Sequence, residues 1–315
     1  MEMRLPLEVQ LDVDGAVDRF GGLALEWLDQ LSAELCPAER RALDGLPARV
    51  ARSATPFGSL GEPGSLFGVL TVTRWSDGGS VRMAERTCSA AGFRWLGQQL
   101  EDPPREASLR FGRLDERGHR AGQLLSLAVE HAPESAGWLR LLGYVPEDEF
   151  LDPGTGATTQ QRWLQAVFAF ADRVNPGFGH LSYHYGGGTA LEDSLRGGRY
   201  PREWRDHKFT VNDCRHYLRG YSWLTIVPEE LIGPLGGVEG LRASGAFSDV
   251  RPLSHGGAWL LATRDYREFS DEALTRVFHV LAPVLRPGKP MVLPQMNGDP
   301  PQRLVFQDAA DFGGR

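Results

Sequence analysis

The chain has 315 residues, of which 41% are hydrophobic and 24% are charged, and its formal net charge is −7. This composition is typical of a globular protein with a core of its own, and the length allows one large domain or two ordinary ones. The negative balance argues against nucleic acid as a partner, because a nucleic-acid surface needs clustered basic groups.

The sequence indicates a cytoplasmic protein without a membrane span. Its apolar runs, such as 166–171, are far too short to cross a bilayer, and no apolar stretch precedes the first acids as a secretion signal would require. Cys36, Cys88 and Cys214 are widely spaced and form no CxxC pair. This spacing predicts neither a disulfide framework nor a zinc knuckle.

The first 135 residues predict a mixture of strands and helices. Apolar and polar residues alternate from Leu5 to Asp12, which is the pattern of a half-buried strand. Apolar residues then recur at three- and four-residue spacing from Val17 to Leu35, which predicts an amphipathic helix. After a loop at 52–65 rich in Gly, Pro and Ser, we expect a strand at 66–75, a helix at 83–100 and strands at 107–114 and 123–130.

The rest of the chain predicts a similar mixture. A strand is expected at 138–145, and the clearest helix runs from Gln160 to Val174, where Asn-Pro-Gly ends it. Strands follow at 178–185, 221–227, 248–253 and 258–263. Pro228 with two acids marks one further helix start, and Ser270 marks another that runs to Leu285.

This order of elements predicts an α+β fold, with mostly antiparallel sheets and helices packed on one face. We place an N-terminal α+β half at 1–135, a C-terminal half at 136–290 and a Pro/Gly-rich tail at 291–315, with the halves packed as one compact unit. The two halves have similar element content, so a duplicated architecture is possible, although no residue-level repeat proves it.

Histidine supplies the candidate metal ligands, and His180, His184, His207 and His216 are the four considered. His180 and His184 share a face of the expected strand, but at this spacing their Cα atoms lie roughly 13 Å apart, which two imidazoles barely span. HExxH is absent as well. The sequence therefore favours neither a metal site nor any other cofactor.

One thiol and one base lie close together in the sequence. Cys214 is two residues before His216, and on an extended segment this spacing points both side chains the same way. A reactive thiolate needs such a base. A boundary loop with ordinary side chains is the favoured interpretation, and a thiol-dependent or metal-dependent enzyme remains the alternative.

Acidic residues supply the candidate partner contacts. Glu147, Asp148, Glu149 and Asp152 bracket Phe150, so that the charges would steer a basic partner and the ring would anchor it. A solvated loop is the competing interpretation.

Two further candidate contacts lie later in the chain. Glu192 and Asp193 follow a glycine loop, where no helix start expected from the sequence explains them, and Trp204 stands in a polar stretch. A loop tryptophan either closes the edge of the core or contacts a partner.

The stretch around 220–247 has a G-x-x-W-L-T strand, a leucine, an L-G-G turn and a further leucine, at Gly220, Trp223, Leu224, Thr225, Leu231, Leu235, Gly236, Gly237 and Leu241. This pattern resembles a bacterial family of type VI secretion immunity proteins, whose members carry G-x-x-W-L-T followed by L-x-x-L-G-G. In this chain one more residue separates the two leucines of the second motif. The segments 178–187 and 256–263 are similar to flanking strands of that family. The resemblance covers about 137–285, consists of core and turn residues, and carries over no catalytic residue.

This resemblance implies a non-catalytic immunity protein that neutralises a secreted toxin by binding it. The acidity of the chain would suit a basic partner, such as a nuclease toxin. Two alternatives stay open. One is an enzyme that uses His180, His184, His207 or Cys214, and the other is an accessory scaffold protein of a secretion or biosynthetic cluster.

Overall fold

The computed structural model describes residues 5–15, 17–46, 58–75, 80–132, 135, 137–185, 190–196, 211–292 and 294–312. The chain divides into two compact units. Unit 1 contains 1–14, 133–138 and 147–315, and unit 2 contains 15–132 and 139–146. The first strand thus belongs with the C-terminal part of the chain, and residues 139–146 belong with the N-terminal part. A single boundary at 135/136 does not describe this exchange of segments.

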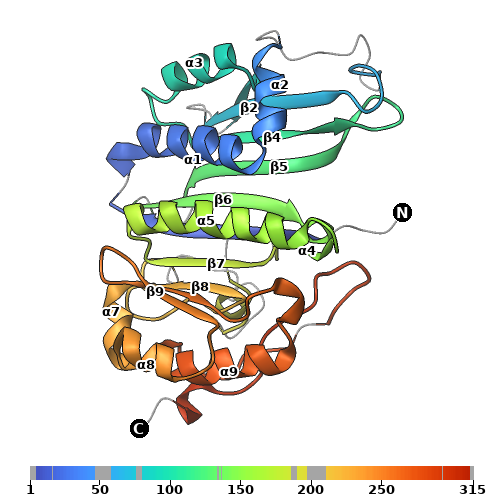
Figure 1. Ribbon diagram of the computed structural model, residues 1–315. Helices are drawn as coiled ribbons and strands as arrows, with labels where there is room; N and C mark the ends of the chain where they lie inside the picture. Colours follow the sequence, from blue (N-terminus) through green and yellow to red (C-terminus); the bar gives the residue numbers. More distant parts are fainter. Residues whose placement is uncertain are drawn as a thin grey trace. The chain divides into compact units, whose positions relative to one another are not determined.

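Unit 2 is an antiparallel sheet with helices on its apolar face (Figure 1). Its strand order is β3-β2-β4-β5-β6, formed by β2 (Leu66–Trp75), β3 (Val81–Thr87), β4 (Glu106–Leu114), β5 (Arg120–His131) and most of β6 (Trp138–Pro146). The helices are α1 (Phe20–Leu35), α2 (Pro37–Asp44) and α3 (Ala90–Gln99). Leu70, Leu109 and Leu127 lie side by side across β2, β4 and β5. A helix on this face removes them from water.

Unit 1 is also an antiparallel sheet, with the strand order β1-β7-β8-β10-β9. Its strands are β1 (Pro6–Asp14), β7 (Phe178–Tyr183), β8 (Leu224–Val227), β9 (Asp249–Pro252) and β10 (Ala258–Leu261). Its helices are α4 (Glu147–Leu151), α5 (Gly156–Val174), α6 (Leu191–Arg196), α7 (Glu229–Ile232), α8 (Gly237–Ala243) and α9 (Asp271–Leu281). Short 3₁₀ turns lie at Val17–Arg19, Gly233–Leu235, Tyr266–Glu268, Ala282–Val284 and Ala309–Asp311.

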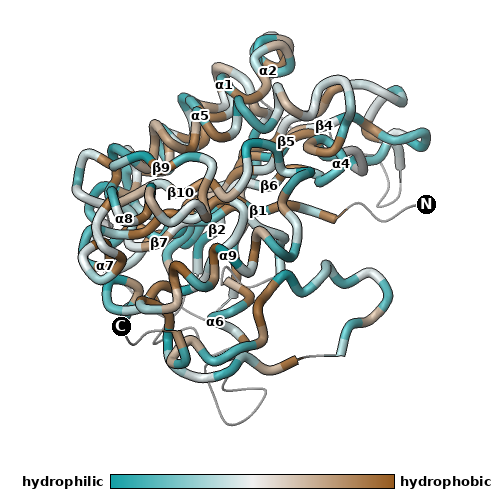
Figure 2. The backbone as a smooth tube through the Cα atoms, turned by 60° about the horizontal axis from the view of Figure 1, so that its bottom comes forward, coloured by the Kyte–Doolittle hydropathy of each residue, from teal (hydrophilic) through white to brown (hydrophobic). Residues whose placement is uncertain are grey.

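The apolar face of the unit 1 sheet carries α5. Leu11, Gly179, Ile226 and Trp259 lie in one row across β1, β7, β8 and β10. Phe168 of α5 packs edge-on against Trp259, with ring centroids 5.5 Å apart. Hydrophobic and hydrophilic segments alternate along α1 and α5, as amphipathic helices require (Figure 2).

The α+β class and the antiparallel sheets expected from the sequence are confirmed. The expected helix at 83–100 is wrong in its first part, because 81–87 pairs with β2 as strand β3. Helix α3 begins after Ser89, whose hydroxyl accepts a hydrogen bond from the Gly92 amide at 3.2 Å. Within the described residues, no helix has the length and apolar character needed to cross a membrane.

Two glycines in α3 give a matched test of packing in unit 2. A Cβ at Gly92 would lie 2.0 Å from the carbonyl oxygen of Thr87, whereas a Cβ at Gly97 would meet nothing within 4 Å. We expect Gly92→Ala to lower the free energy of unfolding by about 1–3 kcal/mol through overpacking. Gly97→Ala should raise it by about 0.5–1 kcal/mol through helix propensity. Urea unfolding measures both variants, and equal effects would contradict this packing.

Candidate functional site

Polar side chains of β1 lie in the interior of unit 1. Glu8, Gln10 and Asp12 alternate with apolar residues and therefore share one face of the strand. They are 2%, 0% and 0% exposed, so the expectation of a half-buried strand with a solvated polar face is wrong. The reason is tertiary, because α6 and the segment 211–220 lie against this face, and buried polar groups need partners.

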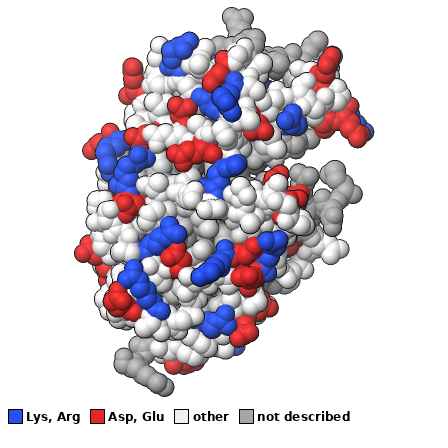
Figure 3. Space-filling model, viewed as in Figure 1, with Lys and Arg blue, Asp and Glu red and all other residues white. Residues whose placement is uncertain are grey.

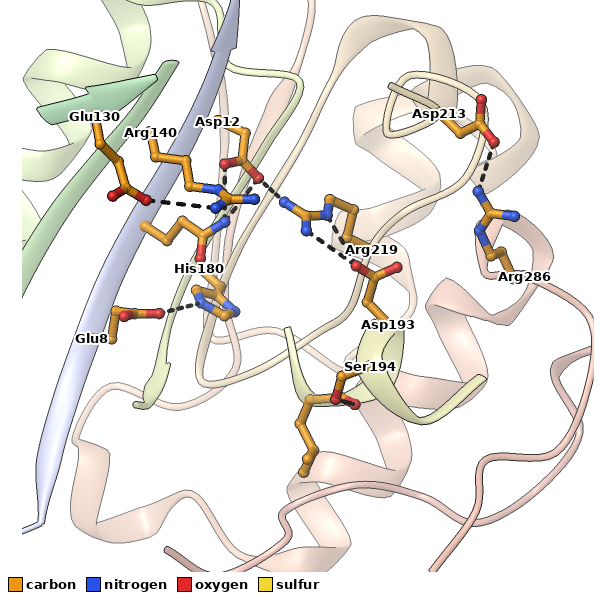
Figure 4. Close-up of polar contacts among 12 residues, drawn as sticks. Glu8, Asp12, Glu130, Arg140, His180, Asp193, Ser194, Asp213, Arg219 and Arg286 are labelled. Atoms are coloured by element: carbon orange, nitrogen blue, oxygen red, sulfur yellow. Dashed lines mark hydrogen bonds and ion pairs between the residues drawn. The ribbon is translucent and has the colours of Figure 1, made fainter. Parts of the chain in front are cut away.

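Two histidines converge on the carboxylate of Glu8. Glu8 stands opposite Ser182 in the ladder, which places its side chain between residues 180 and 184 as diagonal neighbours. Nδ1 of His184 lies 2.6 Å from Oε2 of Glu8, and Nε2 of His180 lies 3.8 Å from Oε1. Figure 4 shows His180 directed at Glu8. His180 is buried, whereas the His184 side chain is 33% exposed.

This arrangement keeps Glu8 ionised. Burial by itself raises the pKa of Glu8, but the two imidazoles, His180 at 3.8 Å and His184 hydrogen-bonded at 2.6 Å, outweigh burial and hold that pKa at about 2. The hydrogen bond to Glu8 raises the pKa of His184 above its ordinary value of 6.5. A carboxylate with so low a pKa is a poor general base at neutral pH and serves instead to orient the imidazoles.

Arg219 is the centre of a second buried group. Its guanidinium lies between Asp12 of β1 and Asp193 of α6, as Figure 4 shows, and it donates hydrogen bonds to both carboxylates. The Asp193 contacts are 3.1 and 3.2 Å. Gln10 donates to both oxygens of Asp12 at 2.9 Å. Burial lowers the pKa of Arg219, but the charges of Asp12 and Asp193 raise that pKa by more than burial lowers it. The guanidinium therefore stays charged.

A third ion pair connects the same segments nearer the surface. Arg215 donates to both oxygens of Asp14, at 2.8 and 2.6 Å, and to Glu230 of α7 at 3.1 Å. The two arginines of one short segment therefore hold the end of β1 to α6 and α7. The described ion pairs of Arg215 and Arg219 thus connect β1, α6 and α7, which are far apart in the sequence. These charged contacts fix the positions of the three elements relative to one another.

The other candidate metal and thiol residues form no reactive pair beside this cluster, although Cys214 is close enough to Asp12 and Arg219 to interact with their charges. Cys214 is fully buried, and burial raises the pKa of its thiol, whereas His216 is exposed. The segment 211–216 forms turns, so the expectation that these two side chains point the same way is wrong. His207 lies outside the described residues. In the described ranges no three His, Cys, Asp or Glu side chains are arranged to hold a metal ion.

The acidic segment lies where α4 begins. Phe150 is completely buried in edge-on contacts with Trp223 and Tyr266, so the expectation that its ring anchors a partner is wrong. Glu147 accepts a hydrogen bond from the Tyr183 hydroxyl at 2.5 Å. Glu149 is half-buried, whereas Asp148 is exposed.

Asp152, which follows α4, is also exposed but has a structural role. Its side chain accepts hydrogen bonds from the Thr155 hydroxyl and from the amides of Gly154 and Thr155, and these lower its pKa. The loop that leads into α5 depends on these contacts.

The remaining candidate contacts are interior residues or lie outside the described part. Glu192 is 3% and Asp193 5% exposed, so the expectation that they meet a partner is wrong, since Asp193 instead pairs with Arg219. Trp204 lies outside the described residues. Sequence reasoning missed Glu8, Asp12 and Arg219. Two signals were available in the sequence. The polar positions of β1 carry three groups that need partners if they are buried, and a later segment carries two arginines four residues apart, at 215 and 219.

Removal of Arg219 tests the buried ion pairs. Arg219→Met leaves Asp12 and Asp193 buried without their common cation, and we expect the free energy of unfolding in urea to fall by about 3–5 kcal/mol. Arg219→Lys keeps the positive charge but loses the planar set of N–H donors, so its free energy of unfolding should fall by less than that of Arg219→Met. The control is Arg276→Met, because Arg276 and Glu272 form an exposed pair 2.9 Å apart on α9. Its cost should stay below about 0.5 kcal/mol, and comparable losses in both methionine variants would contradict the role of Arg219.

The Glu8 pair predicts a pH window of stability. The pKa of Glu8 is lowered from 4.5, so its contribution is present above that pH and is lost as the pH falls toward 2. The pKa of His184 is raised from 6.5, so its contribution is present below that pH and is lost as the pH rises through the raised value. Wild type should therefore exceed Glu8→Gln in unfolding free energy most clearly between pH 4.5 and 6.5.

The control for this titration is Glu272→Gln, a carboxylate whose side chain is 84% exposed. Its stability difference from wild type should vary little over the same pH range. A Glu8→Gln difference that grows steadily above pH 6.5 would contradict the charged pair.

Comparison with known proteins gives a likeness of fold. No family model matches the chain, and no curated protein matches it. A solved structure of a Pseudomonas aeruginosa type VI secretion system protein is similar to it, with a TM-score of 0.50 and 14% sequence identity. The similarity covers 97% of this chain and 80% of that protein. At this identity the likeness shows a common fold alone.

Proposed function

We propose that this chain is a non-catalytic immunity protein that binds and neutralises a toxin of a type VI secretion system in the cytosol of the cell that makes it. The observation that carries the proposal is the fold likeness to a type VI secretion system protein over 97% of the chain. The motif resemblance at 137–285 points to the same system. The net charge of −7 suits a basic toxin by charge complementarity.

Helix α4 and the residue that follows it offer a contact for such a partner. Asp148 and Asp152 are exposed there, and Leu151 between them is 41% exposed, so Leu151 takes the anchoring role first given to Phe150. On the face seen in Figure 3, acidic and basic side chains of the described residues are interspersed. Attraction of a basic partner would then depend on local groups such as Asp148 rather than on one extended patch.

An acid–base enzyme is the second candidate, which the convergence of His180 and His184 on Glu8 favours. His184 is partly exposed and would be the group that meets a substrate. A substrate screen with Glu8→Gln as the control tests this candidate. Turnover that is lost in Glu8→Gln, while the variant stays folded, would replace the binding proposal.

A charge reversal on α4 tests the binding proposal. The chain is coexpressed with the toxin domain encoded beside its gene, the two proteins are separated, and their association is followed by stopped-flow mixing. In Asp148→Lys the association rate should fall about tenfold at low salt, and its dependence on ionic strength should weaken.

The matched control is Glu272→Lys, which makes the same charge change in the first turn of α9. It should leave the association rate within about twofold if steering is local to α4. Failure of the chain to bind or neutralise any toxin domain encoded near its gene would refute the immunity proposal itself.

A further inference from the structure

Among the strands that the structure describes, β3 is an edge of the unit 2 sheet, and large apolar side chains of this edge lie in solvent. Val81 is 53% and Met83 63% exposed, and Trp75 of β2, directly opposite Val81, is 56% exposed. Residues two apart on a strand, and residues opposite each other, share a face, so these three form one apolar row. The guanidinium of Arg105 stacks 4.4 Å from the Trp75 ring and holds this ring in place.

The edge strand of unit 1 shows how an edge is normally protected. Strand β9 has only four residues, ends in Pro252 and carries an Arg251–Asp249 ion pair at 2.6 Å. Strand β3 has seven residues, contains no proline, and within the described residues forms no side-chain ion pair. A long edge strand with exposed apolar residues is open to pairing with another strand.

The opposite face of β3 carries Arg82, a charge that meets no carboxylate of the described residues. Arg82 stands directly opposite Arg74 of β2, and like charges in this position repel. Arg74 donates to the carbonyl oxygens of Gln99 and Asp102 and lies 3.9 Å from the Asp102 carboxylate. Arg82 makes no hydrogen bond or ion pair with any described residue.

Arg86, four residues further, is a second positive charge on this face, although its guanidinium stacks 5.1 Å from the Trp95 ring and donates to the Glu85 carbonyl oxygen. Arg82 is therefore the main charge that a partner strand would meet. A carboxylate on a strand next to β3 would lie opposite Arg82 and relieve the repulsion.

We propose that β3 is a docking edge for a strand of a partner protein that alternates acidic and apolar residues. The acids lie opposite Arg82 and Arg86, and the apolar residues extend the row of Trp75, Val81 and Met83. Backbone hydrogen bonds between β3 and the partner strand supply affinity, and the alternation of acidic and apolar side chains in the partner supplies specificity. This inference goes beyond the immunity proposal, because it holds for any protein partner and uses unit 2 instead of α4.

A second copy of this chain fits the edge poorly. Symmetric antiparallel pairing centred on Ala84 places Arg82 opposite Arg86, and pairing centred on Arg82 places two copies of Arg82 opposite each other. Pairing centred on Met83 avoids these contacts but places Val81 opposite Glu85. Like charges directly opposite are destabilising, so an acidic partner strand is favoured over self-association.

The probe is a fluorescein-labelled peptide of seven residues that alternates valine and glutamate, with valine at both ends. We expect it to bind the full chain in fluorescence anisotropy about tenfold more tightly than the same peptide with lysine for glutamate. Hydrogen exchange should slow in 81–87 when the acidic peptide binds. In Arg82→Glu the preference should reverse toward the lysine peptide.

The control variant is Arg251→Glu on the β9 edge, which should leave both affinities unchanged. Binding of neither peptide, equal binding of both, or slowed exchange away from 81–87 would overturn the proposal. Light scattering that finds a dimer, which Arg82→Glu dissociates, would assign the edge to a second copy and overturn it as well. None of these results bears on toxin binding through α4, which the Asp148→Lys measurement decides separately.

Discussion

The arrangement of unit 1 depends on one guanidinium that neutralises two buried carboxylates. Asp12 belongs to the N-terminal strand and Asp193 to a helix some 180 residues later, and Arg219 lies between them with its side chain 1% exposed. Removing an isolated ion from water costs several kcal/mol, so neither acid is stable inside the protein without Arg219. The apolar face of β1 would bury itself against almost any amphipathic helix. The polar face of β1 can be buried only by segments that supply a counterion for Asp12. This requirement determines that the segment with Arg219 lies against it.

Interior charges of this kind restrict where the molecule meets a partner. Glu192, Asp193 and Phe150 were attractive contacts in the sequence, yet each is buried and committed to internal packing or pairing. The exposed acids at α4 remain, together with Leu151. The buried ion pairs resist rearrangement, because moving one charge leaves another without its counterion. We therefore expect partners to bind preformed surfaces of the described segments, with no exchange of these internal pairs.

Strand β9 of unit 1 and strand β3 of unit 2 are edge strands of different character. Strand β9 is short and ends in proline, which are the usual means of preventing edge pairing. Strand β3 instead combines exposed apolar residues with an arginine that faces another arginine. An exposed apolar row costs solubility, and a like-charge pair costs stability, unless a partner covers them. Strand β3 also carries charged residues, but its length, its lack of proline and its exposed apolar row leave it more open to a partner strand than β9.

The sequence by itself determined the elements with strong local signals and which of their residues share a face. The helix expected at 160–174 is α5, and the caps expected at Pro228 and Ser270 begin α7 and α9. These features are local, because periodicity and capping depend on neighbours within a few residues. The alternation at Leu5–Asp12 likewise identified β1 and its two faces.

Only the tertiary structure decided what covers each face. Alternation cannot distinguish a polar face in water from one that meets Arg219 and His180, since both carry the same residue types. The segment 81–87 became a strand because β2 offers it a ladder, although its residues also suit a helix. Phe150 is in the core because Trp223 and Tyr266, far along the chain, enclose it. In each case the deciding contact is distant in sequence, and a local pattern carries no information about it.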